Sequence, residues 1–292
     1  MSNPIGDQEI RPLSKREFEQ FRQLAYEKFG LDLRSGKEEL VSARLGKKIR
    51  ELHFRSYREY YEHVLEDQTG EALAALIDAL TTNHTSFFRE SAHFDLLRET
   101  ILPPLRDRGQ ISIWSAACSS GEEPYTIAFS AIEELGDLAF SKIRILATDI
   151  STRVLASAEK GVYPAARFES MHGLQMRRYL LRGQGRWNDW YQVKPEIRRM
   201  VEFRRLNLME NFAQLGPFPV IFCRNVMIYF DKPTQQELVR RLAGRLEPGG
   251  YLLIGHAESL NAIEHPLRYV KPAVYRKPEA GVAAKPVRRG RL

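Results

Sequence analysis

The sequence contains little cysteine and no long hydrophobic run. Its 292 residues include two cysteines, too few for a disulfide framework, which indicates a reducing, cytoplasmic location. No apolar run reaches the about 18 residues that a membrane-spanning helix needs, so insertion into a membrane is not expected. The first residues, MSNPIGDQEIRP, lack the basic and then apolar pattern of a signal peptide. Secretion by that route is therefore not expected.

Patterns for metal binding and for nucleophilic catalysis are also missing. The seven histidines show no H-E-x-x-H or similar spacing, so the sequence predicts no metal site. Cys118 and Cys223 lie at the ends of predicted strands far apart in the chain, and we expect them to be core or cofactor-wall residues rather than nucleophiles. His256, at the end of a strand, could face a site or serve a hydrogen-bonded structural role. Trp187 and Trp190 are expected to belong to a core rather than to a binding cage.

The net charge of +7 is unevenly distributed. Residues 44–58 carry a net charge of +5 and residues 278–292 carry +3, so the remaining chain is close to neutral. The last stretch, PEAGVAAKPVRRGRL, has no apolar periodicity and is predicted to be a disordered, solubilising tail. The basic balance therefore indicates one basic helix and one basic tail, and it does not suit a body that tracks a phosphate backbone.

The first part of the chain has the pattern of a small helical bundle. Ser14 and Glu17 form a capping box before an apolar-periodic helix that Gly30 ends. Further helices are expected over residues 37–53, after a cap at Ser56, and over 71–82. We assign residues 1–81 to an all-helical N-terminal domain.

After residue 82, short apolar strands alternate with helices. Such alternation predicts an α/β fold with a doubly wound parallel sheet, which binds ligands at the carboxyl ends of its strands. The segment 268–277 reads as two strands that form an antiparallel sheet edge. The domain is expected to span residues 82–277, with strands at 111–116, 143–149, 201–208, 219–225 and 251–256 and helices at 123–135, 151–160 and 234–248.

One stretch interrupts this alternation. Residues 161–199 contain two tryptophans, clustered glycines and several basic residues. This composition is typical of hairpins rather than of a crossover helix. We therefore expect an inserted antiparallel β-subdomain at about these residues.

The turn within WSAACSSGEEPY (114–125) carries the first chemical signal. Small side chains and Gly121 follow a strand and let a ligand approach the backbone closely. A dinucleotide-binding turn would leave the next helix N-terminus open to pyrophosphate, but Glu122 and Glu123 stand there. The turn therefore suits a cationic nucleoside without phosphate, such as S-adenosylmethionine. Asp149, at the end of the next strand, could accept hydrogen bonds from ribose hydroxyls or cap the following helix.

Four segments together resemble the CheR-type chemotaxis receptor methyltransferases. The resemblance covers nearly the whole chain and implies a Rossmann-like methyltransferase sheet preceded by a helical domain. It also implies methyl transfer from S-adenosylmethionine to glutamate side chains of chemoreceptors, which gives glutamyl methyl esters and S-adenosylhomocysteine. The segments that carry it are TTNHTSFFRE (81–90), WSAACSSGEEPYTIA (114–128), FCRNVMIYFD (222–231) and GGYLLIGHAESL (249–260).

The resemblance also implies a role for each matched residue. One departure is Cys118, where the family commonly has a small residue such as Ala. The implied cofactor-binding positions are Asn83, Thr85 and Arg89 over the cofactor, Glu123 at its ammonium group, Asp149 at the ribose, Asn207 and Leu208 beside the adenine, and Asn225 and Val226 in the wall.

The chemistry of this reaction needs positioning more than proton transfer. A glutamate with a pKa of about 4.3 is already ionised at neutral pH, and the thioether leaving group needs no proton. General acid–base catalysis therefore contributes little. We expect Arg89, with Tyr229 as a possible neighbour, to orient the acceptor carboxylate through one oxygen and leave the other free to react.

The resemblance implies a function for the basic helix predicted over residues 37–53. Receptor methylation sites lie on acidic helices, which Arg44, Lys47, Lys48 and Arg50 could dock; a solvated basic face is the alternative. Arg182 and Gly183 stand where the family uses a subdomain loop for receptor contact, although a simple glycine turn would have the same sequence. The expected partners are chemoreceptors, with no nucleic acid, and the expected state is a monomer.

The fold class is also compatible with two rival functions. A methyltransferase that modifies exocyclic base amines would place N-P-P-Y or a close variant after the fourth strand, where this chain has CRNVMIYF. A non-catalytic docking or sensing module would keep the fold and lose the transfer. The intact set of motif residues favours the enzyme over this module.

Overall fold

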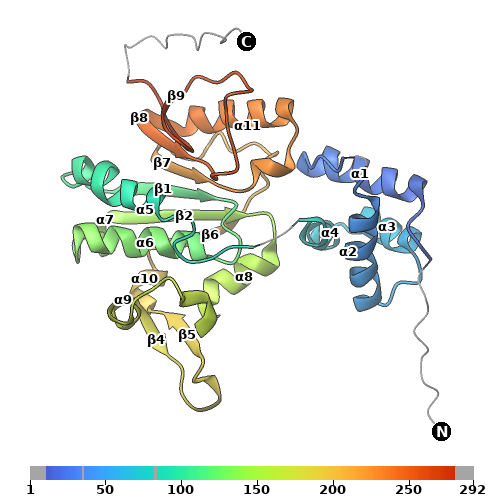
Figure 1. The fold of residues 1–292 in the computed structure, drawn as a ribbon, viewed down its shortest axis with the longest axis horizontal. Helices are drawn as coiled ribbons and strands as arrows, with labels where there is room; N and C mark the ends of the chain where they lie inside the picture. Colours follow the sequence, from blue (N-terminus) through green and yellow to red (C-terminus); the bar gives the residue numbers. More distant parts are fainter. Residues whose placement is uncertain (1–10, 35, 82–83, 280–292) are drawn as a thin grey trace. The chain divides into compact units, whose positions relative to one another are not determined.

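A computed structural model describes residues 11–34, 36–81 and 84–279 (Figure 1). The chain divides into two compact units, Met1–Asn83 and His84–Leu292. Most of the tail predicted to be disordered lies outside the described residues. In the described part of the chain, no helix has both the length and the apolar character needed to cross a membrane.

The first unit contains the four predicted helices. The capping box is confirmed: the Ser14 hydroxyl accepts from the Glu17 N–H, and the Glu17 carboxylate accepts from the Ser14 N–H at 3.0 Å. Gly30 ends the first helix in a left-handed conformation with φ 69°. The helices are α1 (Lys15–Phe29), α2 (Glu38–Glu51), α3 (Tyr57–Glu66) and α4 (Glu71–Leu80).

Aromatic and aliphatic side chains fill the core of this unit. Phe21 of α1, Leu45 and Ile49 of α2, and Tyr60 of α3 are fully buried. The rings of Phe21 and Tyr60 stack with centroids 6.2 Å apart. The apolar stripe predicted for the second helix is therefore the face that α2 packs against its neighbours.

A seven-stranded sheet organises the second unit. Its order is β6-β2-β1-β7-β8-β10-β9, with parallel pairing from β6 to β8 and antiparallel pairing at β10 and β9. The predicted doubly wound sheet with an antiparallel edge is thus confirmed. Its strands are β1 (Ile111–Ala116), β2 (Ile143–Asp149), β6 (Val201–Arg205), β7 (Phe218–Cys223), β8 (Leu246–Leu253), β9 (Arg268–Lys271) and β10 (Val274–Arg276).

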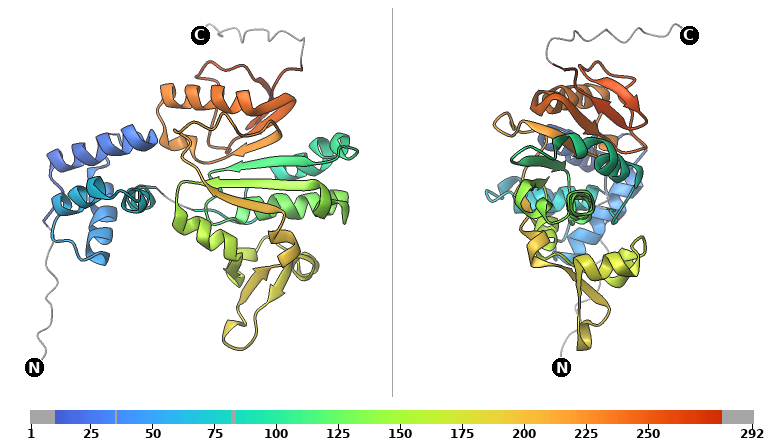
Figure 2. Two further views of the ribbon diagram at one scale, coloured as in Figure 1. Left: turned by 180° about the vertical axis from the view of Figure 1, so that it is seen from behind. Right: turned by 90° about the vertical axis from the view of Figure 1, so that its left-hand side faces the viewer.

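Both faces of the sheet are buried. Along β7, Val220 and Phe222 join one hydrophobic cluster while Ile221 and Cys223 join the other, as the two-residue period of a strand requires. Helices cover the two sides of the sheet (Figure 2). The first cluster includes side chains of α5 (Ala92–Leu96), α6 (Glu122–Leu135), α7 (Leu138–Lys142) and α8 (Thr152–Lys160), and the second includes those of α11 (Lys232–Arg245).

The interrupting stretch forms a three-stranded antiparallel sheet, as predicted, in the order β3-β5-β4. It also contains helices that the sequence analysis did not predict. Trp187 and Trp190 are 49% and 36% exposed and pack edge to face on each other, so the expectation that they form a core was wrong. The elements are β3 (Val162–Pro164), α9 (Gly173–Tyr179), β4 (Leu180–Arg182), β5 (Trp190–Val193) and α10 (Pro195–Arg198).

Several predicted boundaries were wrong: the strand expected over 201–208 ends at Arg205, and the one expected over 251–256 ends at Leu253. The helix expected to reach residue 248 ends at Arg245, and β8 already begins at Leu246. Leu246 pairs with Phe218 of β7, and the register then shifts before Val220 pairs with Tyr251. Backbone pairing with a buried neighbour strand therefore extends β8 through residues that look like a turn.

Candidate functional site

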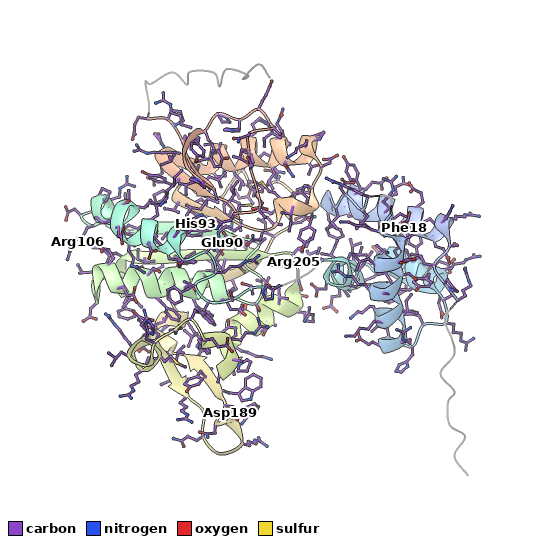
Figure 3. The ribbon with its side chains drawn as sticks, in the orientation of Figure 1. Phe18, Glu90, His93, Arg106, Asp189 and Arg205 are labelled. Atoms are coloured by element: carbon purple, nitrogen blue, oxygen red, sulfur yellow. The ribbon has the colours of Figure 1, made fainter. Side chains whose placement is uncertain are left out.

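The strand ends of the second unit bring the candidate residues to one edge of the sheet. Asp149 is the last residue of β2, and Arg224 directly follows β7. Asn207 follows β6, whose last residue, Arg205, is labelled in Figure 3. Ligands of doubly wound sheets bind at this edge.

The turn after β1 is held in an unusual backbone conformation. Ala117 and Ser119 have φ of 64° and 51°, and Gly121 has φ of 96°. A Cβ on Gly121 would lie 2.8 Å from both Ala158 Cβ and the Tyr163 hydroxyl. Left-handed backbone at non-glycine residues is costly, and its concentration here is typical of a functional site.

Asp149 ties this turn to β2. Its Oδ2 accepts from the Ser119 N–H at 2.9 Å, and its Oδ1 accepts from the Ser151 N–H at 3.0 Å. Each carboxylate oxygen can accept a second hydrogen bond. Asp149 therefore shapes the turn and can also receive ribose hydroxyls.

Glu123 lies at the start of α6, between a hydroxyl and a guanidinium. Its Oε1 accepts from the Ser115 hydroxyl at 2.7 Å, and its Oε2 accepts from Arg224 Nη1 at 3.0 Å. Burial raises the pKa of Glu123, and the charge of Arg224 opposes that rise. The carboxylate is thus held in place by Arg224 before any ligand arrives.

Arg224 also binds the segment that precedes α5. Its Nη2 donates to Glu90 Oε2 at 2.9 Å and to the carbonyl of Arg89, and its guanidinium lies 5.4 Å from the ring centre of Phe94. The Arg224 side chain is only 2% exposed. Burial alone would raise the pKa of Glu90, but its bonds to Arg224 and its other donors lower it overall.

Glu122, the neighbour of Glu123 in α6, has a different set of contacts. It is fully buried, accepts from the Ser120 hydroxyl at 2.7 Å, and lies 3.6 Å from Arg167 Nη1. Arg167 also donates to the carbonyl of Thr85 at 2.9 Å. The two adjacent carboxylates therefore belong to different networks, since Glu122 pairs with Arg167 and Glu123 with Arg224.

Glu258 fixes the loop that follows β7. Its carboxylate accepts from the N–H groups of Asn225 at 2.9 Å, Gly255 and Ile228. Asn225 has φ of 59°, and its side-chain amide donates to Glu90 Oε1 at 3.3 Å. Burial raises the pKa of Glu258, against the effect of these hydrogen bonds. Sequence analysis assigned Glu258 no role, although it lies within a recognised segment.

The remaining predicted site residues follow the ends of β6 and β7. Asn207 is buried, and its side-chain oxygen accepts from the Met209 N–H at 3.0 Å, while Leu208 is buried beside it. Val226 and Tyr229 are partly buried against the same hydrophobic cluster. Asn207 and Leu208 follow the last residue of β6 closely, and their assignment to the adenine stays a prediction.

The predicted acceptor-binding residue stands on the segment that Arg224 anchors. Arg89 is partly exposed, and its Nη1 donates to the carbonyl of His84 at 2.8 Å. Thr85 is buried. Asn83, the third member of this predicted group, lies outside the described residues.

The predicted docking residues occupy exposed and partly exposed positions. On α2, Lys47 lies 4.0 Å from Glu51, whereas Arg44 donates to the carbonyl of Leu80 at 2.6 Å and so helps hold α4. Lys48 and Arg50 lie on the same helix, partly and fully exposed. In the inserted subdomain, Arg182 is exposed, and a Cβ on Gly183 would lie 2.1 Å from the carbonyl oxygen of Trp187.

Three side chains that sequence spacing did not connect also meet here. Glu90, His93 and His256 each place a ligand atom within 4.8 Å of the others. Burial, with the charge of Arg224, lowers the pKa of His93 to about 3. Cys118 and Cys223 are both buried, which raises the pKa of each thiol and agrees with their expected inertness.

This arrangement fits a cationic nucleoside. Asp149 at the end of β2 and Glu123 at the start of α6 present carboxylate oxygens, which are the acceptors that hydroxyl and ammonium groups need. A phosphate at the same edge would meet both carboxylates and be repelled. The donor set therefore fits S-adenosylmethionine, whose sulfonium supplies an electrophilic methyl group.

Known families and proteins match both units of this chain. The family model described as "CheR methyltransferase, all-alpha domain" matches residues 16–81, and "CheR methyltransferase, SAM binding domain" matches residues 83–275. Chemotaxis protein methyltransferase 2 of Pseudomonas aeruginosa is 42% identical over 93% of this chain and 96% of its own length. The Escherichia coli chemotaxis protein methyltransferase is 39% identical over 86% of this chain and 87% of its own. The chain therefore belongs to the CheR methyltransferase family and is an enzyme that uses S-adenosylmethionine as its methyl donor.

Proposed function

We propose that this enzyme methylates glutamate carboxylates of methyl-accepting chemoreceptors in the cytoplasm, acting as a monomer and releasing S-adenosylhomocysteine. The observation that carries the proposal is the 42% identity, across 93% of the chain, to a protein named chemotaxis protein methyltransferase 2. That match includes both the helical unit and the sheet unit. A shared substrate is the simplest reason for a relative to keep both.

The chain's own residues would hold the donor at the edge of the sheet. Asp149 would receive the ribose and Glu123 the ammonium group, while Asn207 and Leu208 would border the adenine. Asn225 and Val226 would complete the wall, with Asn83, Thr85 and Arg89 over the cofactor. Arg224 keeps Glu123 in position through its 3.0 Å contact, so less order has to be gained on binding.

Arg89 would orient the acceptor glutamate. Its backbone is anchored by Arg224 while its side chain stays partly exposed, so the guanidinium can reach an incoming carboxylate. A bond to one oxygen leaves the second oxygen to form the new bond to the methyl carbon. Tyr229, on the loop that Glu258 fixes, is the candidate for supporting this orientation.

Receptor docking would use basic residues in both units. Lys47, Lys48 and Arg50 present positive charge on α2, and Arg44 lies on the same helix. Acidic receptor helices would complement that surface. In the inserted subdomain, Arg182 and Gly183 lie at the end of β4 and could contact the receptor, or a peptide from its C-terminus.

The test is transfer of labelled methyl groups to receptor-bearing membranes. The expected product is a base-labile ester on receptor protein, and label on nucleic acid, or no label at all, would contradict the proposal. Arg89→Ala should lower turnover strongly, with binding of S-adenosylhomocysteine measured separately, and Arg89→Lys should recover part of it. Arg106→Ala is the matched control, because Arg106 is exposed and lies away from Arg205 and the other strand ends (Figure 3).

A further inference from the structure

Two histidines and a glutamate from distant parts of the chain converge beside Arg224. Glu90 lies on the segment that leads into α5 and His93 lies within α5, and both are labelled in Figure 3. His256 follows β8, and its backbone N–H donates to Glu90 Oε1 at 3.1 Å. His93 Nδ1 lies 3.6 Å from Glu90 Oε2, and the two imidazole rings have centroids 5.0 Å apart.

His93 is the unusual member of this cluster. It is 1% exposed, and within the described chain neither of its ring nitrogens has a hydrogen-bond partner. A buried polar group without a partner carries a desolvation cost that folding normally avoids. One of these nitrogens lies within 4.8 Å of ligand atoms on Glu90 and His256, so a cation held between the three would remove part of that cost.

The donor types limit which cation would bind. Two imidazoles and one carboxylate suit Zn²⁺ and its first-row neighbours, whereas Mg²⁺ and Ca²⁺ prefer oxygen ligands alone. Zinc–ligand distances are about 2.0–2.2 Å, so side-chain shifts of about 1 Å would close the cluster. His256 is exposed, which gives the cation a route from solvent and leaves one position for water.

We propose that Glu90, His93 and His256 form a binding site for a divalent transition metal such as Zn²⁺, and that the bound metal competes with Arg224 for Glu90. The competition follows from geometry, since Oε2 of Glu90 is the oxygen nearest both His93 Nδ1 and Arg224 Nη2. The positive charge of Arg224 next to the site is balanced by Glu123. A metal bound to Glu90 would weaken the ion pair between Glu90 and Arg224. Arg224 would then hold Glu123, the carboxylate expected to bind the cofactor, less firmly.

Titration of the untagged full-length protein with Zn²⁺, followed by calorimetry, tests the site. We expect one zinc per chain, at least tenfold weaker binding in His256→Gln and in His93→Gln, and unchanged binding in His63→Gln, an exposed histidine of α3. His256→Gln alters an exposed side chain, so it remains informative if the buried His93→Gln destabilises the fold. Zinc binding that is equal in the parent and in His256→Gln would overturn the proposal.

Two further measurements identify the ligands and the coupling. Bound Co²⁺ should show the ligand-field spectrum of nitrogen and oxygen donors, and a sulfur charge-transfer band would instead place the metal on a cysteine and contradict the site. Saturating zinc should weaken binding of S-adenosylhomocysteine at least threefold in the parent and leave His256→Gln unaffected. Equal affinities with and without zinc in the parent would overturn the proposed competition.

Discussion

Arg224 Nη1 lies 3.0 Å from Glu123 Oε2 while the other terminal nitrogen of the same guanidinium lies 2.9 Å from Glu90 Oε2. One buried cation thus joins the start of α6 to the segment that carries Arg89. Arg224 compensates the negative charges of both Glu90 and Glu123. The candidate cofactor site and the candidate acceptor site are therefore linked through a residue expected to contact neither ligand.

Replacing Arg224 should damage both stability and cofactor binding. Arg224→Gln leaves two carboxylates without their buried partner, and breaking such pairs costs about 3–5 kcal/mol. We expect a fall of this size in the free energy of unfolding measured with urea, together with weaker binding of S-adenosylhomocysteine. The double variant Arg224→Gln with Glu123→Gln should recover part of the stability. A loss of under about 1 kcal/mol in the single variant would show that the pairing is not a major stabilising interaction.

Gly121 should tolerate no side chain, for steric reasons specific to its place. Gly121→Ala would put a Cβ 2.8 Å from Ala158 Cβ and from the Tyr163 hydroxyl. We expect a loss of about 2–4 kcal/mol in unfolding free energy and a marked loss of cofactor affinity, because the turn must shift. Gly36→Ala is the matched control: Gly36 has φ of 91°, close to that of Gly121, but no atom within 4 Å of the added Cβ, so only backbone strain remains. Similar effects of the two variants would contradict the packing argument.

The features predicted most accurately from the sequence are those that depend on the pattern of neighbouring residues. Residues 111–116 and 143–149 form β1 and β2 with the predicted bounds, because small residues and Asp149 mark where the strands stop. The capping box at Ser14 was equally readable. In contrast, β8 starts earlier than predicted, since its pairing with β7 overrides a Pro-Gly-Gly stretch that looks like a turn.

Contacts between distant segments were not predictable from spacing. Arg224 stands in a recognised motif, but nothing in its neighbours indicates that it meets Glu90 and Glu123. His93 and Glu90 have a helical spacing, whereas His256 joins them only because β8 and the segment before α5 meet at one edge of the sheet. A lone arginine following a fully apolar strand was the one available signal, because a charge at such a position needs partners.

The partly buried His265 should make stability depend on pH. Its burial lowers the pKa of the imidazole, and its Nδ1 accepts from the Leu267 N–H at 3.3 Å. The unfolded chain then takes up a proton at a higher pH than the folded chain, so stability is lost as pH falls below about 6.5. His265→Gln should reduce this slope in urea unfolding measured between about pH 5 and about pH 7. An unchanged slope would mean that other groups produce the dependence.

The basic face of α2 should govern receptor affinity without affecting the cofactor. Arg44 is left intact because it holds the carbonyl of Leu80, and the variant replaces Lys47, Lys48 and Arg50 by Ala. We expect the apparent KM for receptor-bearing membranes to rise severalfold, with S-adenosylhomocysteine binding unchanged.

Screening of the α2 charges by salt tests the same docking surface in a second way. Raising the ionic strength from about 0.05 to about 0.3 M shortens the Debye length to less than half, from about 14 to about 6 Å. Salt should therefore weaken receptor binding by the parent and affect the variant little. The double variant Lys15→Ala with Arg16→Ala removes exposed charges from α1 and serves as the control. If the control and the α2 variant raise KM equally, net charge rather than this surface attracts the receptor. If the parent's affinity does not change with salt, docking through charge on α2 is wrong.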